Sequence, residues 1–236
     1  MSDGNAQAGP WFLEPLPWEE RKGLLWGFPK TVWLLFRHPF QSFQRSDAST
    51  LWGTLLFLLV VGLLYGAVQG VDRLLHYYVF HPEMLKWAVE QFPSYKDALP
   101  VFLFLRSVAN AMVCTLFFVA PVTVILFVCL KDNSISKLLG KSTLRIAVYC
   151  LPTLFLTIGT TTGYQVQAIM GLLILIGGIR AIAPAIRNWA PLVAVSAIFA
   201  HHAFWVVWDY LIWGPEAAYQ TIYSTLFTLL YPLLSP

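Results

Sequence analysis

Charged residues are scarce in this sequence. Asp, Glu, Lys and Arg make up 11% of its 236 residues, whereas a soluble domain carries roughly 25%. Hydrophobic residues make up 58%, so the polar residues are too few to cover a globule in water. Several apolar runs approach or exceed the roughly 20 residues that cross a ~30 Å hydrocarbon layer. The composition therefore excludes an ordinary soluble domain and predicts membrane-spanning helices, because a helix satisfies its own backbone in lipid.

Disulfide, metal and catalytic patterns are missing as well. The three cysteines are odd in number and lie in or beside apolar runs (Cys114, Cys129 and Cys150), so we expect buried thiols and no disulfide framework. The sequence has no HExxH, GxSxG, CxxC or GxxxxGK[ST] motif. We therefore predict that the protein is not an enzyme and has no cofactor and no metal. The N-terminus is acidic and rich in proline before its first basic residue, which argues against a cleavable signal peptide.

The apolar runs predict an all-α fold, a polytopic transmembrane helix bundle of about five spans, over residues 49–213. The expected spans are about Leu51–Gln69, Val108–Leu130, Leu144–Gly159, Tyr164–Ile182 and Ala190–Trp213. Pro121 is expected to kink the second span, and residues 71–99 are expected to form a loop. Glycine and alanine recur in the last three spans, where they allow helices to approach closely. Residues 214–236 are apolar but short, so we expect an interfacial helix there, with a sixth span as the alternative.

Residues 1–48 are expected to form a cytoplasmic or interfacial N-terminal segment. From about Arg21 to Arg45 the pattern is amphipathic. The basic residues Lys22, Lys30, Arg37 and Arg45 have helical spacing, and leucine and phenylalanine lie opposite them. A basic face opposite phenylalanine, leucine and tryptophan is typical of a helix lying in the headgroup plane. We therefore predict an N-terminal interfacial amphipathic helix that binds lipid, broken into shorter pieces at Pro29 and Pro39.

The basic residues also predict the orientation. Eleven of the fifteen Lys and Arg residues fall in segments that share a side with the N-terminus, and four fall on the other side. Because positive charge accumulates on the cytoplasmic side, we place the N-terminus in the cytoplasm. Arg180 and Arg187 lie in the inner connection between the last two spans, where they could bind anionic lipid or a partner, or only anchor the topology. Basic residues that follow topology in this way argue against nucleic-acid binding.

Among the polar side chains within or beside the predicted spans, five are candidates for an intramembrane role: Arg106, Asn110, His201, His202 and Asp209. A histidine inside a membrane can ligate haem or metal, or relay protons, so His201 and His202 are the candidates for a cofactor ligand. No other predicted span contains a histidine, and we expect helix–helix hydrogen bonding instead. Arg106 and Asn110 could line a polar path, or Arg106 could extend to the membrane rim.

Three stretches resemble prokaryotic members of the Yip family, the Ypt/Rab-interacting proteins. They are PWEERKGLLWGFPKTVWLLFRHPFQSFQRSD, KSTLRIAVYCLPTLFLTIG and GLLILIGGIRAIAPAIRNWAPLVAV. The resemblance implies a five-span bundle with a cytoplasmic N-terminus. Eukaryotic members of the family bind Rab-type GTPases and act in vesicle traffic, whereas the prokaryotic relatives have no settled biochemical activity.

These observations favour a non-enzymatic, multi-pass protein of the bacterial inner membrane. We expect it to act as a scaffold that binds lipids and other membrane proteins. One alternative is a transporter or channel component that uses His201, Asn110 and Arg106. Another is an accessory subunit of a larger membrane complex, in which His201 or His202 ligates a cofactor.

Overall fold

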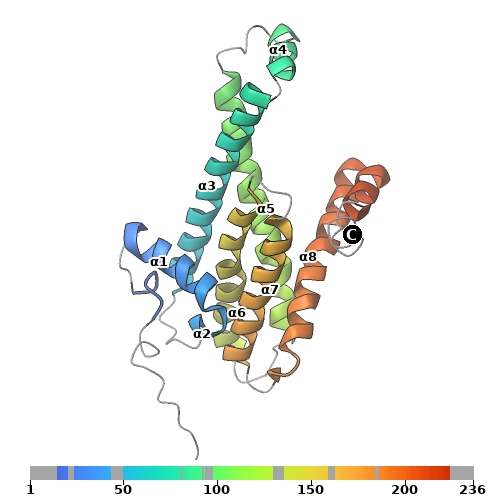
Figure 1. Cartoon of the computed structure of the whole chain (residues 1–236). Helices are drawn as coiled ribbons and strands as arrows, with labels where there is room; N and C mark the ends of the chain where they lie inside the picture. The colour runs from blue at the N-terminus through green and yellow to red at the C-terminus, as the bar shows by residue number, and fades with distance from the viewer. Residues whose placement is uncertain are drawn as a thin grey trace, which may run out of the picture. The chain divides into compact units, whose positions relative to one another are not determined.

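A computed structural model describes residues 15–20, 24–43, 50–80, 82–91, 93, 98–129, 136–158, 163–183 and 186–223. Within these ranges the chain forms helices and no strand, which confirms the predicted all-α class (Figure 1). The α-helices are α1 (Leu24–Arg37), α2 (Pro39–Ser42), α3 (Leu51–Leu75), α4 (Pro82–Gln91), α5 (Leu99–Cys129), α6 (Ser136–Cys150), α7 (Gly163–Ile182) and α8 (Ala190–Trp213). A π-helix (His76–Phe80) extends α3, and a 3₁₀-helix (Leu151–Thr157) extends α6. Residues 215–223 are helical.

Among the described residues, three helical segments are long and apolar enough to cross a membrane: Leu51–Phe80, Pro100–Cys129 and Ala190–Trp213. At 1.5 Å per residue, even the shortest of them is about 36 Å long. All three expose large apolar side chains along their length, such as Leu63, Val124 and Phe199. Two further apolar helices, Thr143–Thr157 and Val166–Ile182, are shorter.

Two sequence-based expectations about helix boundaries were wrong. Residues 71–99 were expected to form a loop, but α3 continues to Leu75, the π-helix reaches Phe80, and α4 follows. Helix α4 has Pro82 and Glu83 in its first turn, where a missing N–H costs little and a carboxylate favours the helix dipole. Pro29 was expected to break the N-terminal helix, yet α1 runs through it. Since Pro29 lies in the second turn, the helix loses only one backbone hydrogen bond.

Pro152 determines how α6 ends. The expected third span, about Leu144–Gly159, is α-helical only to Cys150 and continues as the 3₁₀-helix. Proline lacks the N–H that an α-helix would bond four residues back. By contrast, the predicted last helix, Ala190–Trp213, matches α8 at both ends.

The chain divides into two compact units. The first comprises Met1–Phe57, Val122–Cys150 and Ile169–Ala200, and the second comprises Leu58–Pro121, Leu151–Ala168 and His201–Pro236. Glycines allow close packing within each unit. In the first, a Cβ on Gly177 would lie 2.9 Å from Phe40 Cα, and one on Gly178 would lie 2.7 Å from the Ile146 side chain. This packing confirms the close approach expected from the small residues of the later spans.

In the second unit the close approach joins α3 to α5. A Cβ on Gly66 would lie 2.7 Å from Val108 Cα, and Gly62 and Gly70 also face side chains of α5. The three glycines recur every four residues, so they lie on one face of α3. This GxxxGxxxG pattern is a sequence signal for close helix association in membranes, and it was not among the sequence-based predictions.

Candidate functional site

One face of α1 is exposed and carries both tryptophan and basic side chains. Trp26 and Trp33 are 79% and 60% exposed, and Lys30 and Arg37 are exposed between and after them. The four residues are spaced by four, three and four, so they form a single stripe along the helix. The Arg37 guanidinium lies 6.0 Å from the centre of the Trp33 ring, a cation–π contact. We call these four residues the α1 stripe.

The opposite face of α1 packs against the rest of the first unit. Gly27, Thr31 and Leu35 are buried and recur every four residues. From the sequence, basic residues were expected on one face and bulky apolar residues on the other. Tryptophan was expected on the apolar face, and this was wrong: Trp26 and Trp33 share the exposed face with the basic residues, because they fall in register with Lys30 and Arg37.

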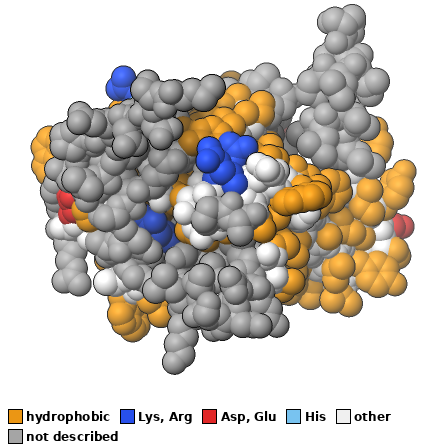
Figure 2. Space-filling view, turned by 90° about the horizontal axis from the view of Figure 1, so that it is seen from below, with side chains coloured by type: hydrophobic (Ala, Val, Ile, Leu, Met, Phe, Trp, Pro, Cys, Tyr) orange, Lys and Arg blue, Asp and Glu red, His pale blue; other side chains and the backbone are white. Residues whose placement is uncertain are grey.

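Arg180 of α7 joins this basic surface. Its guanidinium lies 5.9 Å from the centre of the Phe40 ring in α2, and Phe40 follows Arg37 by three residues. Arg187 is exposed beside Trp189, which is 63% exposed. Figure 2 shows Lys and Arg side chains among hydrophobic ones on one face of the molecule. Lys22 and Arg45, predicted to belong to the same basic set, lie outside the described residues.

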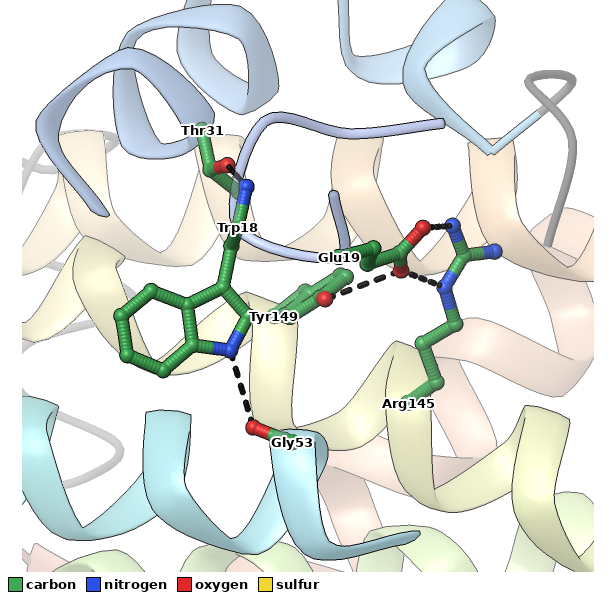
Figure 3. A network of polar contacts seen from close by, with 6 residues as sticks. All are labelled: Trp18, Glu19, Thr31, Gly53, Arg145 and Tyr149. Carbon is green, nitrogen blue, oxygen red and sulfur yellow. Dashed lines mark hydrogen bonds and ion pairs between the residues drawn. The ribbon is translucent and has the colours of Figure 1, made fainter. Parts of the chain in front are cut away.

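A buried ion pair lies in the same unit (Figure 3). Arg145 of α6 donates two hydrogen bonds to Glu19, from Nε to Oε1 (2.5 Å) and from Nη2 to Oε2 (2.9 Å). The hydroxyl of Tyr149, one turn along α6, donates to Glu19 Oε1 at 2.9 Å. The side chains of Arg145 and Glu19 are 2% and 1% exposed. A bidentate pair with a further donor is the geometry that compensates best for burying two charges.

Trp18 fixes the chain next to Glu19. Its backbone N–H donates to Thr31 Oγ1 in α1 (3.0 Å), and its indole Nε1 donates to the Gly53 carbonyl in α3 (2.9 Å). The indole also packs edge-on against Phe28 and Phe57, at centroid distances of 6.1 and 5.4 Å. Residues 15–20 therefore contact α1, α3 and α6. We call them the N-terminal staple.

Gly27 gives the staple a close approach to α1. A Cβ at this position would lie 3.1 Å from the Pro17 carbonyl oxygen and 3.3 Å from Trp18 Cα. In the sequence, Arg145 counted only as a topological charge, and Glu19 was not singled out. No short-range pattern could pair these residues, because 126 positions separate them.

His201 packs on α5 in the second unit. Its Nδ1 lies 3.3 Å from the carbonyl oxygen of Phe117, and its ring contacts Phe118 at a centroid distance of 5.0 Å. A carbonyl oxygen only accepts, so Nδ1 must carry the proton. Pro121 lies four residues after Phe117 in α5 and has no N–H to give that carbonyl. His201 thus donates to the backbone oxygen that Pro121 leaves without its helical partner.

This geometry agrees with the helix–helix hydrogen bonding expected of His201. The His202 ring lies 5.3 Å from the His201 ring, centroid to centroid. Arg106 and Asn110 are exposed on α5, and within the described ranges neither bonds to a histidine. Asp209 accepts a 2.5 Å hydrogen bond from Thr221. Among the residues that the structure describes, no three His, Cys, Asp or Glu side chains gather as a metal site would require.

The second unit also contains a hydrogen-bond network that was not predicted from the sequence. Gln69 Nε2 donates to the Tyr65 hydroxyl at 2.7 Å, which lies 3.2 Å from Thr157 Oγ1. Thr157 Oγ1 in turn donates to the Leu154 carbonyl at 2.7 Å. This hydrogen-bond network links α3 to the 3₁₀-helix. Hydrogen bonds of this kind hold helices together in lipid.

The fold and the surface define the class of protein. The part of the chain that the structure describes is helical, has three helices long and apolar enough to span a membrane, and displays a surface of tryptophan and basic residues. Comparisons with protein-family models, curated proteins and solved structures find no match.

Proposed function

We propose that the chain is a non-enzymatic, Yip-type scaffold of the bacterial inner membrane that holds anionic lipid at its cytoplasmic surface. The α1 stripe is the observation that carries this proposal. Tryptophan is favoured at the headgroup level of a bilayer, and Lys and Arg at the same depth attract anionic lipids. A helix that buries one face and exposes alternating tryptophan and basic residues on the other fits the plane of the interface.

The charges near the stripe support an anionic ligand. Arg180 extends the basic surface from α1 and α2 to α7 through Phe40. The nearby acidic residue Glu19 is already neutralised by Arg145. Each Lys or Arg close to an anionic surface contributes roughly 1 kcal/mol.

Five crossings with a cytoplasmic N-terminus fit the helices. Helix α7 is about 30 Å long at 1.5 Å per residue. The segment Thr143–Thr157 is short, but seven of its residues are 3₁₀-helical. A 3₁₀-helix rises about 2.0 Å per residue, which brings this segment to about 26 Å. With those two crossings added to the three long helices, the basic residues of the first unit fall on the cytoplasmic side, as the eleven-to-four charge distribution requires.

Lipid titration of the purified full-length protein tests the proposal. Phosphatidylglycerol or phosphatidylcholine is added in mild detergent, and bound lipids are counted by native mass spectrometry. Lys30→Gln and Arg37→Gln should each weaken phosphatidylglycerol binding about fivefold, corresponding to roughly 1 kcal/mol per charge, and should leave phosphatidylcholine binding unchanged. Trp26→Ala should weaken the binding of both lipids, because it removes apolar contact.

A matched double variant controls for net charge. Arg73→Gln/Lys86→Gln removes two exposed charges from α3 and α4, where the proposed topology places them outside. It should bind phosphatidylglycerol as the wild type does. Equal losses in this variant and in Lys30→Gln/Arg37→Gln would contradict a specific surface on α1.

A further inference from the structure

We propose that Glu19 and Arg145 are positioning residues for the lipid-binding surface: the N-terminal staple holds α1 with its stripe facing outward. The inference deepens the proposed function and rests on it, because it names what controls the lipid surface. Neither Glu19 nor Arg145 is accessible to lipid, since their side chains are 1% and 2% exposed. Apart from the effect of their charge, they can therefore change lipid binding only by positioning other parts of the chain.

The staple has one attachment on each neighbouring helix. Trp18 N–H binds Thr31 on the buried face of α1, and Trp18 Nε1 binds Gly53 at the start of α3. Glu19 binds Arg145 and Tyr149 on α6. Residues 15–20 thus connect the buried face of α1 to α3 and α6.

The register of α1 turns this attachment into an orientation. Thr31, which accepts the hydrogen bond from the staple, follows Lys30 and precedes Trp33 by two residues in the sequence, but it lies on the buried face of α1. Because successive residues are 100° apart around a helix, fixing Thr31 inward fixes the stripe outward. Gly27, one turn earlier, sits directly against Pro17 and Trp18, so the helix is fixed at two consecutive turns.

Of the contacts that the staple makes, the ion pair between Glu19 and Arg145 should be the most costly to lose. A buried arginine without its carboxylate, or a buried carboxylate without its arginine, is strongly unfavourable. When Arg145 is removed, we expect the Glu19 carboxylate to move toward water and to draw residues 15–20 away from α6. When the Glu19 carboxylate is removed, Arg145 no longer holds residues 15–20 against α6. Helix α1 then loses its fixed rotation, and the tryptophan and basic side chains no longer face the bilayer together.

An electrostatic effect and a positioning role predict opposite changes in lipid binding for Glu19→Gln. The substitution makes the protein more positive, so electrostatics alone would strengthen binding of an anionic lipid. The staple predicts weaker binding, down to the level of the Lys30→Gln/Arg37→Gln variant. Glu20→Gln adds the same charge one residue away and serves as the matched control, which should not weaken binding.

The experiment uses the full-length protein in detergent, with phosphatidylglycerol as the probe and native mass spectrometry as the readout. The variants are Glu19→Gln, Glu20→Gln, Arg145→Met and the exchange Glu19→Arg/Arg145→Glu. We expect loss of binding in Glu19→Gln and Arg145→Met and recovery in the exchanged pair. Recovery separates positioning from a general loss of packing, because the exchange restores only the pair.

A second readout keeps the inference separate from the proposed function. A nitroxide on residue 33, in a background without native cysteines, reports the mobility of α1 whether or not lipid binds. Its spectrum should become more mobile in Glu19→Gln and stay unchanged in Glu20→Gln. If Lys30→Gln/Arg37→Gln weakens lipid binding but Glu19→Gln changes neither binding nor mobility, the staple is refuted and the lipid surface stands. If Glu19→Gln mobilises residue 33 but the charge variants retain lipid, the proposed function fails instead.

Discussion

The hydrogen bond from His201 to the Phe117 carbonyl makes a sharp prediction about Pro121. Replacing His201 with leucine removes the side-chain donor to the Phe117 oxygen, which also lacks its usual i+4 helical donor because Pro121 has no N–H. In a Pro121→Ala background, the alanine supplies that N–H from within α5. The same His201→Leu substitution should therefore be much less harmful when Pro121 is absent.

The size of the coupling follows from interhelical hydrogen bonds in membranes. Such bonds average about 0.6 kcal/mol and reach about 1.7 kcal/mol in double-mutant cycles. His201→Leu also loses ring contacts with Phe118 and Trp205. These losses occur in both backgrounds and cancel in the cycle. The predicted coupling energy between positions 121 and 201 is therefore about 0.6–1.7 kcal/mol.

Unfolding free energies of the four proteins in mixed micelles, titrated with sodium dodecyl sulfate and followed by circular dichroism, give the coupling. His201→Asn is the control, because its amide N–H can replace Nδ1 and should preserve most of the stability. Additive effects of the two substitutions, within about 0.3 kcal/mol, would refute the role assigned to Pro121. So would a His201→Asn variant as unstable as His201→Leu.

Three further predictions concern packing and burial. Gly66→Ala should lower the free energy of unfolding by about 1–3 kcal/mol, because the new Cβ meets the α5 backbone. Gly62→Ala should lower it by less, because the new Cβ meets a flexible methionine side chain. Equal losses in the two variants would contradict this packing. Arg145→Met should cost about 3–5 kcal/mol in the same assay by leaving a buried carboxylate unpaired, and a stability equal to wild type would show that the pair is not buried in solution. Cys129 is exposed and Cys150 is buried, so N-ethylmaleimide should label Cys129 first in detergent, as peptide mass spectrometry can show; faster labelling of Cys150 would be inconsistent with the packing of α6.

The later helices were predicted well from the sequence. The C-terminal end of α8 was predicted correctly because Gly214, which has a positive φ, and Pro215 follow Trp213, and α7 begins at Gly163. Glycine and proline mark such boundaries through their backbone preferences alone. The segment 71–99 was misread because its charged residues suggested a loop, although they are spaced so that a helix can carry them.

The candidate site was predicted only in part. Lys30 and Arg37 were proposed from the sequence because they share a helical face, and Arg180 and Arg187 because they lie in a connection between predicted spans. Their combination with exposed tryptophans depended on how α1 is rotated, which is set by Gly27 and the staple. The Glu19–Arg145 pair could not be predicted, since ion pairing between distant segments depends on tertiary packing and not on local pattern.

The depth of α1 in the bilayer tests the central claim most directly. Nitroxides placed singly at positions 26 and 33 of a cysteine-free full-length protein, reconstituted into phosphatidylglycerol-containing bilayers, report collisions with oxygen and with a water-soluble nickel complex. A third label at Glu90, exposed on α4, serves as the aqueous reference. We predict that positions 26 and 33 collide more with oxygen than with nickel, and that residue 90 shows the reverse. Water-like collision rates at both α1 positions, in protein that retains its helical content, would contradict a membrane-surface role for this helix.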